Sequence, residues 1–378
     1  MLLLSALLVS AVSFPIVYVH YENKNEASNE EMFFGVSFGG TTTSQAKQLI
    51  DKVKGYTNFF LINNWDISTN ETALTEISQY AVDANMSIMV YYDFVPFNNY
   101  TWLQPWLNTA KQKWGDQFLG IYLYDEPGGN QIDTGQWRTG EWVKKAMANL
   151  SDYNDAANRF TTSIPSTVSW QNVESTSLPV ATSDYALYWF DYLAGYDTIF
   201  VELGWNHSRT QHIALCRGAA NVQDRDWGAI IVWTYNNPPH LESGTKILQD
   251  MTTAYQAGAK YIVVFNFPYD QAFGILEEEH FVAMETFWEL THSQSSLEKV
   301  EAEVAFVLPK NYGWGMRRLD DRIWKPEWGP DDKSPLIWEN MNKLIERHGL
   351  KLDIIYDDPQ FNYKEKYSQI YYWNSTIN

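Results

Sequence analysis

Three acidic residues, Asp93, Glu126 and Glu202, stand at or near the ends of apolar runs that are typical of buried strands. Two carboxyl groups about 5 to 10 Å apart, one protonated and one ionised, provide the acid and the nucleophile or base that glycosidic bond cleavage needs. An acid at the end of a strand is also compatible with a solvated loop that does no chemistry. Whether the three acids lie close together therefore depends on the fold.

Short apolar runs alternate with amphipathic stretches from Met32 onward. Apolar strands that alternate with helices indicate a parallel sheet, and eight such units favour a closed barrel over an open sheet. We predict an α/β fold, a (β/α)8 TIM barrel over residues 32–295, with a long loop over 166–182 before a helix near Asp184–Gly195. The expected strands are Phe33–Phe38, Asn58–Ile62, Ser87–Tyr92, Phe118–Tyr124, Arg159–Ile164, Thr198–Leu203, Trp227–Trp233 and Lys260–Phe267.

Alternation along each strand predicts which side chains enter the barrel, and in this fold the C-terminal strand ends carry the site. In the fourth strand, Tyr122, Tyr124 and Glu126 are expected to face inward. The neighbouring Asp125 falls on the opposite side of the alternation. The same reasoning turns the acids of the third and sixth strands inward, so all three acids are predicted to converge on one mouth.

The segment Gly120-Ile-Tyr-Leu-Tyr-Asp-Glu-Pro127 resembles the fourth-strand segment of glycoside hydrolases that have a (β/α)8 barrel. The resemblance covers residues 32–295 as architecture and this segment alone as a motif, and it implies that Glu126 is the acid/base. In the clan with Glu on strands four and seven, strand seven ends in a carboxylate, but here it ends Val232-Trp-Thr-Tyr-Asn236. Glu202 on strand six is the expected partner instead, and the specific family stays open.

The resulting hypothesis is a glycosidase that cleaves a carbohydrate substrate. Glu126 would be the general acid, Glu202 the nucleophile or base, and Asp93 would position the sugar or tune a pKa. The alternative is a surface-tethered barrel that binds glycan without catalysis, because aromatic faces stack on sugar rings in both cases. The sugar, its anomer and the stereochemical outcome stay open. The residues expected to bind substrate are Asn63, Trp65, Tyr91, Tyr124, Asp125, Trp233, Tyr235 and Asn266.

Composition excludes several other classes of protein. A formal charge of −19 excludes a nucleic-acid surface, because phosphate binding needs clustered Lys and Arg. The single cysteine, Cys216, can form no intramolecular disulfide, and we expect it to be a small buried residue of a helix. No zinc, EF-hand or phosphate-loop spacing is present, so we expect no metal and no cofactor.

Gly35-Val-Ser-Phe-Gly39 matches a nucleophile-elbow pattern, but we interpret its glycines as aids to close packing of the first strand.

The two ends of the chain differ from the barrel region. Residues 2–19 are uncharged and apolar, which indicates a signal peptide or signal anchor over 1–20, followed by a polar spacer over 21–31. Together with six N-x-S/T sequons, this segment predicts an extracytoplasmic glycoprotein that contacts a membrane only through its N-terminus. Residues 302–378 are expected to form a small α/β appendage that loosely resembles the flavodoxin-like domain of some β-galactosidases.

Overall fold

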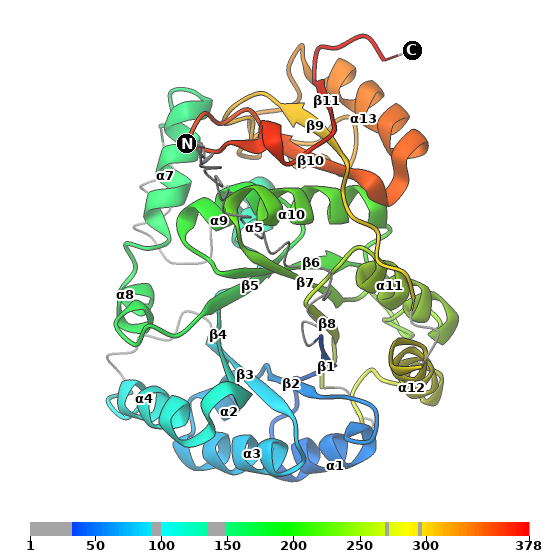
Figure 1. Ribbon diagram of the computed structural model, residues 1–378. Helices are drawn as coiled ribbons and strands as arrows, with labels where there is room; N and C mark the ends of the chain where they lie inside the picture. The colour runs from blue at the N-terminus through cyan, green and yellow to red at the C-terminus, as the bar shows by residue number, and fades with distance from the viewer. Residues whose placement is uncertain (1–31, 93–99, 135–148, 269–271, 294–296, 378) are drawn as a thin grey trace, which may run out of the picture. The chain divides into compact units, whose positions relative to one another are not determined.

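A closed parallel barrel forms the larger part of the computed structural model, which describes residues 32–92, 100–134, 149–268, 272–293 and 297–377. Its eight strands pair in sequence order, and β8 closes the ring by pairing with β1 (Figure 1). The predicted (β/α)8 fold is therefore confirmed. The strands are β1 Phe33–Phe38, β2 Phe59–Ile62, β3 Ser87–Tyr92, β4 Phe118–Leu123, β5 Val180–Asp184, β6 Thr198–Leu203, β7 Asp226–Ile231 and β8 Tyr261–Val264.

Helices lie around the outside of the barrel in Figure 1. Several begin at a side chain that accepts the first free backbone N–H groups. Thr42 caps the first helix by accepting from the N–H of Gln45, and Asn70 does the same for Ala73. The helices are α1 Thr43–Val53, α2 Trp65–Ser68, α3 Glu71–Asp83, α4 Leu103–Trp114, α5 Pro127–Thr134, α7 Tyr153–Ser163, α8 Val168–Glu174, α9 Tyr188–Ala194, α10 Arg209–Gln223, α11 Gly244–Gln256 and α12 Glu278–His292.

Two apolar clusters line the two faces of the barrel strands, as alternation requires. The outer cluster takes Ile199 and Val201 of β6. Close strand contact also explains Gly35, because a Cβ there would lie 1.7 Å from the carbonyl oxygen of Phe59 on β2. The expectation of close packing for this segment is thus confirmed. The inner cluster consists of Phe59, Leu61, Met89, Tyr122, Ala181, Phe200, Ile230, Val232, Tyr261 and Val263.

The fifth unit differs from its prediction. Arg159–Ile164 was expected to be a strand, but it lies almost wholly in helix α7, which Asp152 caps by accepting from the N–H of Asp155. Ala156, Phe160 and Ser163 are buried along one helix face, a spacing of three and four that suits a helix and not a strand. Helix α8 and the first three residues of β5 lie within the expected loop over 166–182. Strand β5 ends in Ser183 and Asp184, where the prediction has the start of a helix.

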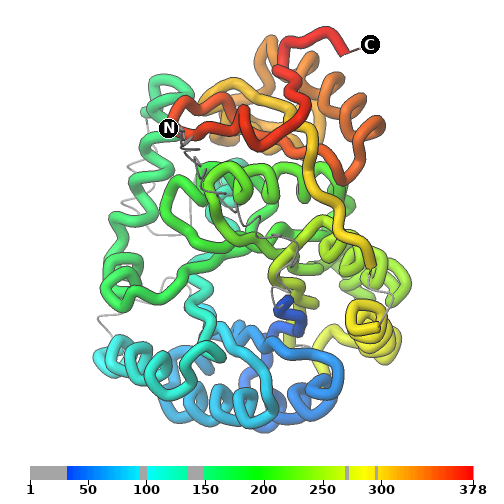
Figure 2. Tube along the Cα trace, in the orientation of Figure 1, coloured from blue at the N-terminus to red at the C-terminus, as the bar shows by residue number. Residues whose placement is uncertain are grey.

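A separate small sheet follows the barrel. It consists of β9 Val304–Leu308, β10 Leu352–Tyr356 and β11 Gln369–Tyr372, all parallel and in the order β10-β9-β11, with helix α13 Ser334–His348 between β9 and β10. The tube in Figure 2 places these strands beside α10, which also carries the buried Cys216 as expected. The sheet and the barrel lie in one compact unit, Met32–Asn378.

Within the described part of the chain, no helix is long and apolar enough to cross a membrane. The signal peptide or anchor predicted for residues 1–20 lies outside the described residues.

A buried ion pair joins the small sheet to the barrel. Arg217 of α10 donates to Asp353 of β10 at 2.8 Å, and the two side chains are 3% and 0% exposed. Asn221 and Tyr367 donate to the same carboxylate, each at 2.8 Å. Its hydrogen bonds are thus complete, which is the condition under which a buried pair is tolerated.

We expect Asp353→Ala to lower the free energy of unfolding by about 3–5 kcal/mol, because it leaves the Arg217 charge buried without a partner. Urea denaturation followed by circular dichroism measures this. Lys351→Ala is the matched control, since its pair with Glu303 is half exposed, and we expect a change below about 1 kcal/mol. Equal effects of the two substitutions would contradict this view of the joint.

Candidate active site

Glu126 and Glu202 lie at the C-terminal ends of β4 and β6, the two strands that pair with β5. Glu202 occupies the second-last position of β6 and is 3% exposed. Glu126 lies three residues beyond the end of β4, and its N–H donates to the carbonyl of Ser183 on β5 at 3.0 Å. The Ser183 hydroxyl donates to Oε1 of Glu202 at 2.7 Å, so β5 links the two acids. The structure therefore brings this predicted pair together at one mouth.

Alternation fails at the end of β4, where the prediction for Tyr124 is wrong. Tyr124 and Glu126 have φ of +64° and +50°, a left-handed conformation that is uncommon for side-chain-bearing residues. The turn sends Tyr124 into the outer cluster, where its hydroxyl donates to Thr167 at 2.5 Å. Asp125 instead joins the inner side, where the Tyr122 hydroxyl donates to it at 2.7 Å. Non-glycine residues held in this conformation concentrate at functional sites.

Burial and neighbouring charge act together on Glu202. Burial raises the pKa of its carboxyl well above the usual range, and the negative charges of Glu126 and Asp125 raise it further. The hydrogen bond from Ser183 opposes this shift only in part. These surroundings favour the protonated form of Glu202, and a second carboxyl group stands close enough to influence it.

Asp184, the last residue of β5, anchors the start of α5. Its carboxylate accepts from the N–H groups of Gly128 and Gly129 at 2.5 and 2.8 Å. A residue of β5 thus satisfies the free N–H groups at the start of α5, as an N-cap side chain would. The two glycines allow this approach, because a Cβ at Gly129 would lie 2.1 Å from the ring of Tyr185. Since α5 begins directly after Glu126, this contact fixes the backbone that carries the acid.

A second buried acid lies behind this anchor. Asp191 of α9 is fully buried, and burial together with the charge of Asp184 raises its pKa well above the usual range. Burial also raises the pKa of Asp184 to about 7, against the four backbone N–H groups that lower it. Two carboxyl groups in contact cannot both ionise in a medium of low dielectric constant. We therefore interpret Asp191 as the neutral member of this pair.

A cavity of about 320 Å³ opens beside Glu126. Burial and the charges of Arg317 and Arg209 lower the pKa of His207 in its wall to about 4, so this imidazole is neutral at physiological pH. Burial and the charge of Glu126 raise the pKa of the Tyr185 phenol, which stays protonated. The described residues that line the cavity are Glu126, Asp133, Tyr185, Trp205, His207 and Arg317.

The other predicted substrate-binding residues are scattered. Tyr91 packs edge-on against Tyr122 at 5.3 Å between ring centroids, beside the inner cluster. Trp233 also borders that cluster and contacts Phe265 at 5.8 Å. Asn266 has a structural role, because its side-chain oxygen accepts from the N–H of Ile275.

Three further predicted residues lie toward solvent, and one cannot be placed. Trp65, at the start of α2, and Tyr235, beyond β7, are 39% and 47% exposed. Asn63 follows β2, is half-buried, and donates from its backbone to Phe38. Asp93 lies outside the described residues.

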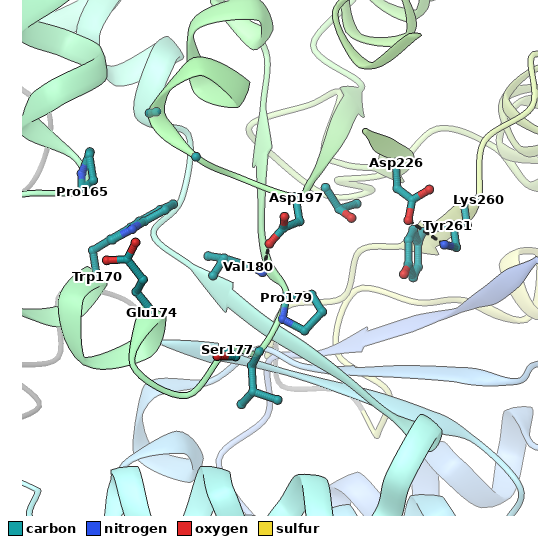
Figure 3. A pocket seen from close by; sticks show the side chains of 14 residues that line it. Pro165, Trp170, Glu174, Ser177, Pro179, Val180, Asp197, Asp226, Lys260 and Tyr261 are labelled. Atoms are coloured by element: carbon teal, nitrogen blue, oxygen red, sulfur yellow. Dashed lines mark hydrogen bonds and ion pairs between the residues drawn. The ribbon is translucent and has the colours of Figure 1, made fainter. Parts of the chain in front are cut away.

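A larger cavity, of about 590 Å³, lies away from the acids. Figure 3 shows its lining, which includes the first residues of four strands: Val180, Thr198, Asp226 and Tyr261. It is therefore at the N-terminal ends of the strands. Residues at that end of a (β/α)8 barrel serve stability, whereas the chemistry is carried at the other end.

Sequence reasoning missed Ser183, Asp184, Asp133, His207 and Arg317. The run Val180-Ala-Thr-Ser-Asp184 carries a usable signal, a strand that ends in two polar residues, but the predicted loop covers its first three residues and the predicted helix begins near Asp184. Asp133 and Arg317 gave no local signal, because only folding brings them together. Across the described ranges, no group of three or more His, Cys, Asp or Glu is arranged to hold a metal ion.

Comparison with solved structures establishes the fold alone. The α-L-fucosidase isoenzyme 2 from Paenibacillus thiaminolyticus is similar with a TM-score of 0.53 and 12% identity, over 90% of this chain and 59% of that one. The chain thus spans less than two thirds of that relative. The endo-β-1,4-mannanase from Thermotoga petrophila gives a TM-score of 0.47 at 7% identity, over 74% and 82% of the two chains. No protein-family model and no curated protein matches the sequence.

The buried acids predict how stability depends on pH. A folded-state pKa of about 7 for Asp184, against 3.8 ordinarily, means that folding takes up protons. The associated stabilisation is complete below about pH 4 and is lost as pH rises through about 7. The free energy of unfolding of the wild type should therefore fall between pH 5 and pH 8. We expect this fall to be smaller by about 1–2 kcal/mol in Asp191→Asn.

Chemical denaturation at several pH values measures this difference. The control is Asp116→Asn, since the Asp116 side chain is fully exposed, and it should leave the slope with pH unchanged. If Asp191→Asn also left the slope unchanged, the two acids would not share a proton.

Proposed function

We propose that the chain is a glycoside hydrolase whose carboxyl pair is Glu126 and Glu202. One observation carries the proposal: Glu202 is buried beside Glu126 at the C-terminal mouth of a (β/α)8 barrel, where burial and the charge of Glu126 favour its protonated form. A neutral and an ionised carboxyl group in one site are the two reagents of glycosidic bond cleavage.

The roles within the pair follow from their surroundings. Glu202 is more buried and holds the proton, so it is the general acid in this proposal. Glu126 lines the cavity and is the nucleophile or the base. This exchanges the roles assigned from the sequence, where Glu126 was the acid. Because the charge of Glu126 raises the pKa of Glu202, the two carboxyl groups influence each other's titration.

The cavity suits an uncharged sugar. Trp205 and Tyr185 offer aromatic surface for the apolar face of a ring, and His207 is neutral. Asp133 and Asp321 balance the cation Arg317, so the cavity does not attract an anionic substrate. The apolar segment over residues 2–19 supports action outside the cytoplasm. The fold likeness to an α-L-fucosidase makes a fucoside one reasonable test substrate.

We expect Glu202→Gln and Glu126→Gln each to lower kcat/KM by at least about 100-fold on 4-nitrophenyl glycosides, because each removes a reacting group. The panel contains neutral hexosides and the α-L-fucoside. Loss of the acid is felt less with a 2,4-dinitrophenyl leaving group, which needs little protonation. Glu202→Gln should therefore recover on that substrate, whereas Glu126→Gln should not.

The control is Glu174→Gln, which alters an acid that lines the larger cavity at the opposite strand ends. It should retain full activity. Wild-type protein that binds glycans but hydrolyses none of the panel would favour the non-catalytic barrel. Loss of activity only in Glu174→Gln would place the site at the wrong end of the barrel.

A further inference from the structure

The segment between β9 and α13 brings a cation to the cavity from outside the barrel. Arg317 lines the cavity together with Glu126, although the barrel strands end far earlier in the sequence. Its side chain is 13% exposed. An arginine that is mostly buried needs partners for its charge and for its N–H groups.

Two carboxylates hold this guanidinium in a fixed plane. Nη1 and Nη2 donate to Asp133 at 2.9 and 2.8 Å, and Nε and Nη2 donate to Asp321 at 2.8 Å each. The charge and hydrogen bonds of Arg317 keep the pKa of both acids low, although burial alone would raise it. Bidentate pairs of this kind fix geometry as well as charge.

Asp133 transmits this constraint to the candidate site. It lies on α5, seven positions after Glu126, and both residues line the cavity. Tyr185 donates to the same carboxylate at 2.8 Å, and the Arg317 guanidinium lies 5.3 Å above its ring. Arg317 therefore contacts both the far end of α5 and one wall of the cavity, and Arg322 of the same segment also donates to Asp133, at 3.2 Å.

The segment that carries Arg317 is itself fixed to the barrel. Gln131 of α5 donates to the carbonyl of Trp324 at 3.0 Å, and Gln211 of α10 donates to the carbonyl of Met316. The Trp324 ring packs edge-on against Phe190 at 4.5 Å between centroids. These contacts stand on both sides of Arg317 in the sequence and make it a rigid support for the helix.

We propose that Arg317 is a positioning residue, which orients Glu126 by clamping α5 through Asp133 to the segment between β9 and α13. Asp184 fixes the first turn of α5, and Arg317 fixes its last described turn. The inference rests on the proposed function, because it assigns the orientation a role in catalysis. Arg317 acts through Asp133 and takes no part in the reaction.

The test combines hydrogen exchange with kinetics in the full chain. In Arg317→Ala we expect backbone amides of α5 to exchange about tenfold faster, a change of about 1.4 kcal/mol in the opening equilibrium. On the 4-nitrophenyl glycoside that the wild type cleaves best, we expect kcat to fall about 10- to 100-fold with KM nearly unchanged, because misplacing a reacting group impairs the chemical step. Arg317→Lys should recover part of both effects.

Arg318→Ala is the matched control, since this neighbouring arginine pairs with Asp320 in solvent at 3.0 Å. It should change neither measurement. Asp133→Asn removes the α5 end of the clamp while leaving Arg317 bonded to Asp321, so it replaces Arg317→Ala if that variant does not fold.

The outcomes separate the two proposals. Unchanged exchange in α5 would overturn the clamp whatever the activity. Faster exchange with an unchanged kcat would overturn the positioning role and leave the hydrolase intact. A wild type without hydrolytic activity would overturn the proposed function, and the positioning role with it, while the exchange data would still report whether the clamp exists.

Discussion

A single buried carboxylate, that of Asp184, accepts four backbone N–H groups where β5 meets α5. Two of these groups begin α5, and two belong to the turn that follows β5. One side chain thereby fixes the two segments that frame the mouth of the barrel. Without it, four buried donors would lack an acceptor, each at a cost of about 1–3 kcal/mol. The place of Glu126, one residue before α5, depends on this contact.

Burial, which makes the Asp184 anchor strong, also raises the pKa of the neighbouring carboxyl groups. Glu202 and Asp191 stand in surroundings that disfavour a charge, and each has another carboxyl group beside it. The result is a cluster of acids that carries fewer charges than carboxyl groups. Asp191 lies behind the anchor, whereas Glu202 lies beside Glu126, which lines the cavity. The hydroxyls of Tyr122 and Ser183 join the cluster without adding charge.

The small C-terminal sheet belongs to the same compact unit as the barrel. The buried pair of Arg217 and Asp353 joins them on one side, and the segment that carries Arg317 reaches the mouth on the other. Folding of this sheet is therefore linked to the geometry of the candidate site. A barrel without residues 302–378 would lose one wall of its cavity and the support of α5.

The sequence by itself determined the barrel and the positions of most strands. Short continuous apolar runs are typical of parallel strands that are covered on both faces. Within a regular strand such as β6, alternation placed Glu202 inward correctly. The sequence did not determine β5, because the Thr and Phe residues of Arg159–Ile164 also suit a strand, and only the burial of one helical face shows that this segment is a helix. The left-handed turn at Tyr124 was also hidden, since alternation holds only while the backbone stays extended. Tertiary structure alone decided the contacts of Asp184 with α5 and of Arg317 with Asp133, because each joins segments whose local sequences carry no mark of the other.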